Sequence, residues 1–226
     1  MLKKKIIYLD NAATTRILKK FVAEMEKFYL DNFGNPSSIH EMGELALEAV
    51  SDARRRLALE IGCKAEEITF TSGTTESNNL AFFGLVRGDL GKRRKKIIIS
   101  SIEHSSIFEI CNALKKEGFE IIEVGVDRDG ILDIGKLKRE IDDNVLLVSV
   151  IHVQNEIGVV QDLREIGRLC HGKGVLFHSD CAQSFGKLNI RAKDFGIDLL
   201  STGAHKIGGP KGIGFLYVRE GLKLVP

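Results

Sequence analysis

Residues 68–79 read ITFTSGTTESNN, and this stretch contains the strand-to-helix transition that decides the fold. Ile68–Thr71 has the length and apolar character of a buried strand. Ser72–Gly73 predicts a tight turn, and Thr74–Thr75 opens a helix whose free backbone N–H groups suit an anion. Taken alone, the stretch favours an ordinary helix cap in which Glu76 reaches back, and the two roles are compatible.

Outward from this stretch, apolar runs of strand length alternate with helical patterns. The predicted strands are Ile68–Thr71, Ile97–Ser100, Glu120–Val124, Val145–His152, Val175–His178, Asp198–Ser201 and Ile213–Val218. The predicted helices are Leu18–Leu30, Ser38–Leu59, Thr75–Val86, Ser105–Glu117, Ile134–Ile141 and Leu163–Gly172. This alternation predicts an α/β domain with a mostly parallel sheet of about seven strands flanked by helices. A short Gly-rich connection allows the last strand to run antiparallel.

Composition limits the function classes. The chain has 226 residues, enough for one large domain or one domain and a fragment, and 43% of them are apolar. Lys and Arg number 33 against 31 Asp and Glu, so a nucleic-acid groove is not expected. The basic run Lys92–Lys96 is predicted to be solvated surface. The four cysteines form no CxxC pair, so neither a zinc site nor a disulfide framework is expected.

The N-terminal sequence indicates no targeting or membrane segment. The apolar run after the first lysines is too short for a signal peptide, and no window is long enough to span a membrane. We therefore expect a cytoplasmic protein that does not contact a membrane.

Polar residues follow five of the predicted strands, at the edge where open α/β sheets bind their ligands. These groups are Thr71–Thr75, Glu103–His104, Asn155–Glu156, Asp180–Gln183 and His205–Lys206. No P-loop and no G-x-G-x-x-G fingerprint occurs where those motifs require one, which argues against an ATPase or NAD enzyme. The set suits an anionic ring cofactor.

Three of these residues have both an ordinary and a functional interpretation. Asp180 is typical of a turn, or it could hold a protonated ring nitrogen. Lys206 is typical of a solvated loop, but the neighbouring glycines allow a desolvated lysine that forms a Schiff base. His104 is typical of a surface loop, or its ring could stack on an aromatic cofactor.

Seven motifs, in order along the whole chain, carry a family resemblance. They are Tyr8–Thr15 (YLDNAATT), Asn35–His40 (NPSSIH), Phe70–Asn79 (FTSGTTESNN), Glu103–His104, His152–Val160 (HVQNEIGVV), His178–Lys187 (HSDCAQSFGK) and His205–Gly214 (HKIGGPKGIG). With them the sequence resembles the NifS/IscS-like cysteine desulfurases, within the class V aminotransferases of pyridoxal-phosphate (PLP) fold type I. The resemblance implies an N-terminal arm, residues 1–15, and a PLP-binding large domain, residues 16–226.

The resemblance also implies roles for individual residues. Lys206 would bind PLP covalently, and it would act in catalysis with His104, which would stack on the ring. Asp180 would pair with the pyridine nitrogen, and Asn155 and Gln183 would hydrogen-bond near the phenolic oxygen. The phosphate would be bound by Thr74 through its backbone, Thr75 and His205.

Two departures from the family pattern concern the end of the chain and the phosphate site. Gly203 stands where the family has Ser or Thr, so one phosphate hydroxyl contact is expected to be missing. The family continues into a small domain with the substrate-binding arginine and the catalytic cysteine, so the chain resembles the cofactor-binding part of an enzyme truncated at its C-terminus. Cys181, beside the ring-nitrogen partner, is expected to have a packing role.

Three functions remain open from the sequence. The first is part of a cysteine desulfurase, which converts L-cysteine to L-alanine and leaves a persulfide for iron–sulfur cluster assembly through a scaffold or another sulfur acceptor. The second is a selenocysteine lyase or another class V aminotransferase. The third is a non-catalytic scaffold subunit. The family implies a homodimer.

Overall fold

The computed structural model describes residues 6–225, so residues 1–5 of the expected arm and residue 226 of the expected large domain lie outside it. A seven-stranded sheet runs through the domain in the order β1-β7-β6-β5-β4-β2-β3. The strands are β1 Ile68–Thr71, β2 Lys96–Ser100, β3 Glu120–Val124, β4 Val145–Ser149, β5 Leu176–Asp180, β6 Leu199–Gly203 and β7 Gly214–Val218. Only β7 runs antiparallel to its neighbours β1 and β6, which confirms the predicted mostly parallel sheet.

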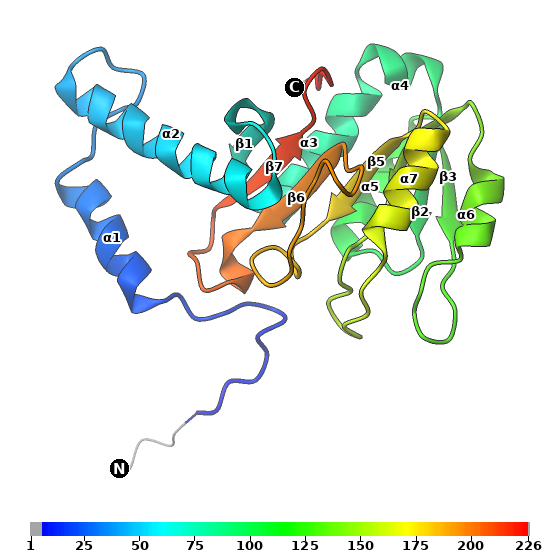
Figure 1. Ribbon diagram of the computed structural model, residues 1–226, viewed down its shortest axis with the longest axis horizontal. Helices are drawn as coiled ribbons and strands as arrows, with labels where there is room; N and C mark the ends of the chain where they lie inside the picture. Colours follow the sequence, from blue (N-terminus) through cyan, green and yellow to red (C-terminus); the bar gives the residue numbers. More distant parts are fainter. Residues whose placement is uncertain (1–5, 226) are drawn as a thin grey trace.

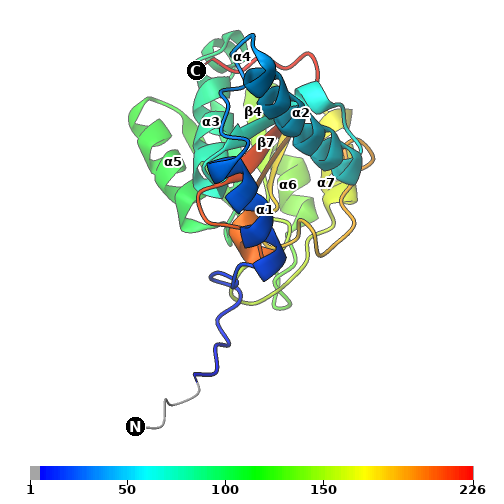
Figure 2. The same cartoon turned by 90° about the vertical axis from the view of Figure 1, so that its left-hand side faces the viewer.

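Helices cover both faces of this sheet (Figures 1 and 2). They are α1 Lys19–Leu30, α2 Glu41–Ile61, α3 Thr74–Val86, α4 Asp89–Arg93, α5 Ser105–Lys116, α6 Ile134–Glu140 and α7 Leu163–Gly172. One apolar cluster joins the sheet to α2, α6 and α7, and the other joins it to α3 and α5. The sheet is therefore buried on both faces, as its continuous apolar strands predict.

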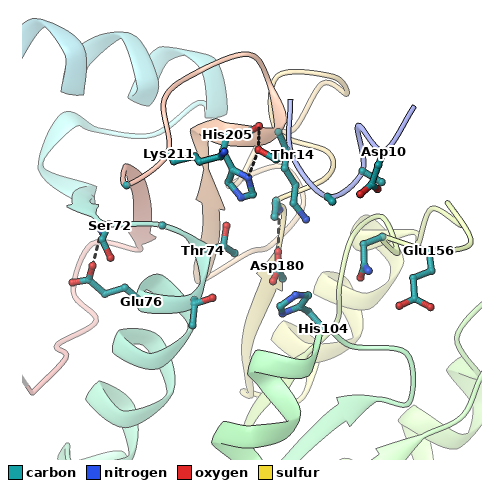
Figure 3. A pocket seen from close by; sticks show the side chains of 18 residues that line it. Asp10, Thr14, Ser72, Thr74, Glu76, His104, Glu156, Asp180, His205 and Lys211 are labelled. Atoms are coloured by element: carbon teal, nitrogen blue, oxygen red, sulfur yellow. Dashed lines mark hydrogen bonds between the residues drawn. The ribbon is translucent and has the colours of Figure 1, made fainter. Parts of the chain in front are cut away.

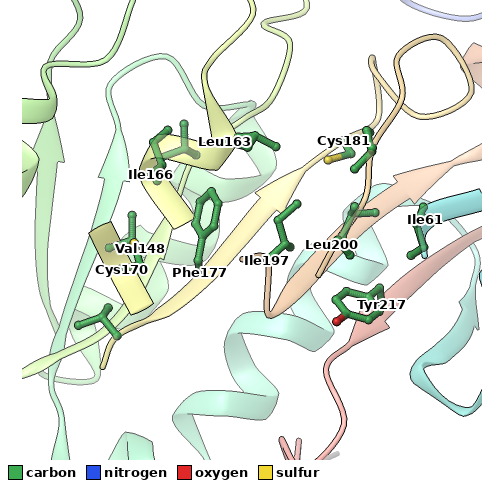
Figure 4. Close-up of a cluster of buried hydrophobic side chains, with 14 of the residues drawn as sticks. Ile61, Val148, Leu163, Ile166, Cys170, Phe177, Cys181, Ile197, Leu200 and Tyr217 are labelled. Carbon is green, nitrogen blue, oxygen red and sulfur yellow. The ribbon is translucent and has the colours of Figure 1, made fainter. Parts of the chain in front are cut away.

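Helix α7 shows how the sequence produces this packing. Leu163, Ile166 and Cys170 recur at helical spacing and are buried against the sheet, as Figure 4 shows. Asp162 caps the helix by accepting hydrogen bonds from the backbone N–H groups of residues 164 and 165 at 3.0 and 3.1 Å. At Gly167 a Cβ would lie 1.9 Å from the Phe195 carbonyl oxygen, so only glycine permits this close approach.

Three local details differ from the sequence-based expectations. Strand β4 ends at Ser149 rather than His152, although the His152 N–H still donates to the Asp180 carbonyl at 3.0 Å. The five-residue α4 was not predicted. Lys96 is buried rather than solvated, because its ammonium donates to Asp142 at 3.0 Å and to the Glu140 carbonyl at 2.8 Å. None of the helices described is long and apolar enough to cross a membrane.

Candidate functional site

A cavity of about 780 Å³ opens at the carboxyl ends of the parallel strands. The N-terminal arm, the start of α3, the loops after β2 and β4, the end of β5 and the loop after β6 contribute its walls. Seven of the predicted site residues line it, and Figure 3 shows several of them around one space: Thr74, Thr75, His104, Asn155, Asp180, His205 and Lys206. The structure therefore brings seven of the eight predicted site residues to one cavity, and their roles stay predictions.

Asp180 lies at the inner end of the cavity. It ends β5 and is 2% exposed. Its Oδ1 accepts from the Ala182 N–H at 2.9 Å, and its Oδ2 accepts from the Asn78 side-chain amide at 3.0 Å. These two donors compensate the carboxylate for the loss of water. Asn78, fully buried on α3, was not assigned from sequence.

Lys206 ends the short 3-10 turn Ala204–Lys206 and is half-buried. Desolvation lowers the pKa of its ammonium; the charge of Asp180 acts in the opposite direction, and the charge of Lys187 lowers the pKa further. A lysine that loses its proton more easily is a better nucleophile toward a carbonyl group.

The start of α3 can receive an anion. The Ser77 N–H donates to the Gly73 carbonyl at 3.0 Å, which leaves the N–H groups of Thr74 and Thr75 free of backbone partners among the described residues. Glu76 reaches back and accepts from the Ser72 N–H at 2.6 Å, and hydrogen bonding by the Ser72 side chain, followed by its backbone, lowers the pKa of the Glu76 carboxyl. The start of the helix therefore combines the ordinary cap with free N–H groups that could bind an anion.

Gly203, the departure from the family pattern, borders this anion site. The Thr74 hydroxyl is buried and has no hydrogen-bond partner within residues 6–225. A Cβ built on Gly203 would lie 3.0 Å from the Thr74 Oγ1. The threonine hydroxyl thus lies next to the space that a side chain at residue 203 would enter, and glycine leaves room for it.

His205 adds an imidazole to the same end of the cavity. Desolvation lowers its pKa first, and the charges of Lys206 and Lys211 lower it further. Its Nδ1 lies 3.2 Å from the Thr14 hydroxyl, and its carbonyl accepts from the Thr15 N–H at 2.7 Å. Two threonines of the YLDNAATT motif therefore hold the loop that carries Lys206.

His104 lines the cavity from the start of α5. Its Nδ1 accepts from the Ser106 N–H at 3.1 Å and lies 2.8 Å from the Ser106 hydroxyl. The preceding Glu103 is buried, and its Oε1 accepts from the Ser100 hydroxyl and from the Ile151 N–H at 2.7 Å. Desolvation raises the pKa of Glu103 to about 8, despite these hydrogen bonds. Glu103 thus connects β2 to the segment after β4 next to His104.

Gln183 is the one predicted residue that does not line the cavity. It is buried, and its amide donates to the Ala12 carbonyl of the N-terminal arm at 2.7 Å. Its Oε1 accepts from the Lys187 ammonium at 3.4 Å. In this arrangement Gln183 attaches the arm to the domain.

The residues present fit PLP. A carboxylate with two donors lies at the inner end, a half-buried lysine of lowered pKa lies in the loop after β6, and free N–H groups lie at the start of α3. These are the groups that a pyridine nitrogen, an aldehyde and a phosphate require.

The fold and the cavity define an α/β domain whose strand ends carry the groups that an anionic ring cofactor requires. A family model described as Aminotransferase class-V matches residues 7–224, so the chain belongs to the class V aminotransferase family.

Curated relatives sharpen this assignment. The cysteine desulfurase IscS of Dictyoglomus turgidum is 42% identical over 223 residues, which are 99% of this chain and 56% of the relative. The cysteine desulfurase IscS of Rickettsia felis is 47% identical over 215 residues, 95% of this chain and 52% of the relative. The expected similarity to NifS/IscS-like cysteine desulfurases is confirmed, and the chain spans about half the length of these relatives.

Solved structures of similar proteins have the same fold as this chain. A structure described as SspA in complex with cysteine has a TM-score of 0.94 and 39% identity, covering 98% of this chain and 64% of that one. A NifS-like protein has a TM-score of 0.95 and 35% identity, covering 98% and 61%. The predicted PLP fold type I architecture is confirmed by these neighbours.

Proposed function

We propose that this chain is the PLP-binding part of a cysteine desulfurase that converts L-cysteine to L-alanine and passes sulfur on as a persulfide. The observation that carries the proposal is the convergence of Lys206, Asp180 and His104 on one cavity. Similarity to the IscS relatives and to the cysteine-bound SspA structure supports cysteine as the substrate.

Different residues of this chain would bind different parts of the cofactor. PLP, when bound, supplies an electron sink conjugated to the substrate amine. Asp180 would hold the protonated pyridine nitrogen, and the free N–H groups of Thr74 and Thr75 would bind the phosphate together with His205. Asn155, which lines the same cavity, would bind near the phenolic oxygen, and Gln183 would support that side through the arm.

Lys206 and His104 would move protons. The lysine amine, whose pKa is lowered, would take a proton from the substrate Cα and return it during the reaction. His104, on the ring face, would support this transfer and exclude water from that side.

The sulfur-accepting thiol is proposed to lie outside this chain. All four cysteines are among the described residues, and none lines the cavity: Cys63, Cys111, Cys170 and Cys181. Burial raises the pKa of each thiol to about 12, so none is a ready thiolate. The corresponding cysteine would come from a segment equivalent to the other half of the relatives.

We also propose a homodimer and a cytoplasmic location, with an iron–sulfur scaffold or another sulfur acceptor as the protein partner. Residues 6–15 would act as part of an N-terminal arm, and the rest as the large domain. The proposed homodimer is supported by exposed apolar side chains on the arm and α1, which a second copy of the chain would cover. Among them are Leu9, Val22, Phe28 and Tyr29. Helix α1 has no buried residue in this chain.

Visible absorbance of the purified chain after addition of PLP tests the cofactor assignment. We expect a band that is absent from Lys206→Ala and retained in Lys173→Ala, a change at an exposed lysine on the far end of α7. A chain without the band, or a band that survives Lys206→Ala, would refute the cofactor site.

Product analysis tests the reaction. With L-cysteine, alanine and sulfide are measured together. Sustained release of both by this chain alone would contradict the assignment of the thiol elsewhere, and transamination without sulfide would favour another class V activity.

A further inference from the structure

Two residues outside the predicted site, Asn78 and Ser106, connect Asp180 to His104. The Asn78 amide donates one hydrogen to Asp180 Oδ2 at 3.0 Å and lies 3.1 Å from the Ser106 hydroxyl, to which it donates the other. The Ser106 hydroxyl in turn lies 2.8 Å from His104 Nδ1. A continuous line of hydrogen bonds therefore runs from Asp180 to His104, through α3 and α5.

The direction of each hydrogen bond in this line is determined. Asp180 accepts, so the Asn78 nitrogen faces it; the reversed amide would place an oxygen against the carboxylate. Asn78 then has only a hydrogen to offer Ser106, and the Ser106 oxygen must accept it. The Ser106 hydroxyl keeps one hydrogen, which it can donate to His104 Nδ1.

His104 Nδ1 also receives a second donor. The backbone N–H of Ser106 points at the same nitrogen, at 3.1 Å, as the N-cap contact of α5. A nitrogen that accepts from two donors carries no proton itself. The neutral ring must therefore carry its hydrogen on Nε2, the nitrogen for which no described residue provides a partner.

We propose that Asn78 and Ser106 are positioning residues, which fix His104 as the Nε2–H tautomer and hold the Asp180 carboxylate at the inner end of the same cavity. This inference rests on the proposed function, because the two ends of the line are the ring-stacking and ring-nitrogen residues. Asn78 is fully buried with no other donor role, and its Oδ1 has no partner among the described residues. Burial of such a half-satisfied amide is costly, and the line to Asp180 and Ser106 accounts for its presence.

The tautomer can be read directly by nitrogen-15 NMR of the histidine rings in the cofactor-free chain. His104 signals are assigned by their absence from His104→Ala.

We expect one Nε2–H tautomer in the wild type and in two variants. Ser106→Thr keeps the hydroxyl, and Ser105→Ala is the matched change at the exposed neighbouring serine. In Ser106→Ala we expect a mixture of tautomers, because one of the two donors to Nδ1 is gone. A wild-type ring protonated on Nδ1, or a Ser106→Ala spectrum equal to wild type, would overturn the proposal.

The other end of the line is tested by cofactor affinity. Asn78→Leu removes both donors at similar volume, and we expect PLP to bind about tenfold more weakly, since Asp180 loses a charge-assisted hydrogen bond. Unchanged affinity in a folded variant, checked by circular dichroism, would contradict this end of the line. If the wild-type chain does not bind PLP, the proposed function fails, while the tautomer result on the cofactor-free chain still stands or falls separately.

Discussion

The inner end of the cavity and its N-terminal wall are built in opposite ways. The inner end is formed by Asp180 and supported by Asn78 and Glu103, which do not line the cavity; all three are buried and hydrogen-bonded into the sheet and its helices. The wall is residues 10–15 of the arm, attached through the loop that carries His205 and through Gln183. Just before it, Leu9 is 84% exposed. The difference indicates that the polarity of the site is set by the core, while its closure depends on a few hydrogen bonds between the arm and the rest of the domain.

The largest effect is expected at the inner end, from Asp180→Asn. This change removes the charge and turns one acceptor into a donor that faces the Asn78 amide or the Ala182 N–H. Loss of a charge-assisted hydrogen bond in a buried site predicts PLP binding weaker by about 100-fold. Titration of PLP absorbance measures it, with the exposed Asp143→Asn as control. An affinity within twofold of wild type would show that the inner end does not set the polarity.

A smaller effect, on stability, is expected from Glu103→Gln. The folded-state pKa of Glu103 is raised to about 8, so between its unfolded value and pH 8 the folded state holds a proton that the unfolded state has lost. The stability that the raised pKa of Glu103 contributes is therefore fully present below the unfolded-state pKa, and it is lost as the pH rises from there through about 8. From pH 6 to pH 8.5, wild type should lose about 2 kcal/mol of unfolding free energy more than the variant.

Urea unfolding at the two pH values measures this difference. The exposed Glu109→Gln should follow wild type, because it lacks the buried environment. Parallel pH curves for wild type and Glu103→Gln would mean that Glu103 is ionised in the folded protein, and the inner end would then be more polar than described.

A further test is Gly203→Ala, which adds a Cβ beside the Thr74 hydroxyl without adding the hydroxyl that the family has at residue 203. A Cβ there would lie 3.0 Å from the Thr74 hydroxyl, so crowding should weaken PLP binding by about fivefold, near 1 kcal/mol. Adding Thr74→Ala should restore most of the loss, because the crowded oxygen is removed. Thr74→Ala alone should have little effect, since Thr74 is expected to act through its backbone. A double-mutant cycle with no coupling would contradict this packing argument.

The smallest effect is expected in the wall, from Thr14→Val. The change removes the hydroxyl that lies 3.2 Å from His205 Nδ1 and preserves the side-chain shape. A part-exposed neutral hydrogen bond predicts about a twofold loss of PLP affinity and an unchanged melting temperature. A loss as large as that of Asp180→Asn would show that wall and inner end are equally important.

The sequence predicted those features that depend on local pattern. Periodicity gave six of the helices and all seven strands, with ends shifted by a few residues where, as at His152, hydrogen bonds continue beyond the strand. The strand-end rule located Asp180, His104 and Lys206, because their neighbours along the chain mark the edge of the sheet.

The remaining features depend on contacts between distant segments. Asn78 lies within ITFTSGTTESNN, but its donation to Asp180 joins residues 102 positions apart. The burial of Lys96 depends on its hydrogen bond to Asp142. The threonines of the arm contact His205 only in the folded chain. No spacing rule predicts such pairs, so the positioning residues appear only in three dimensions.

The place of β7 between β1 and β6 has a consequence for how the molecule is made. Residue Ile68 of the first strand pairs with Tyr217 of the last, so β1 has no neighbour in the sheet until almost all of the described chain has left the ribosome. Pairings so distant in sequence form slowly, because loop closure precedes any gain. The turn that follows β1 would therefore acquire its final position only after β7 has been made, and the nascent chain could not complete the cavity for its cofactor before then.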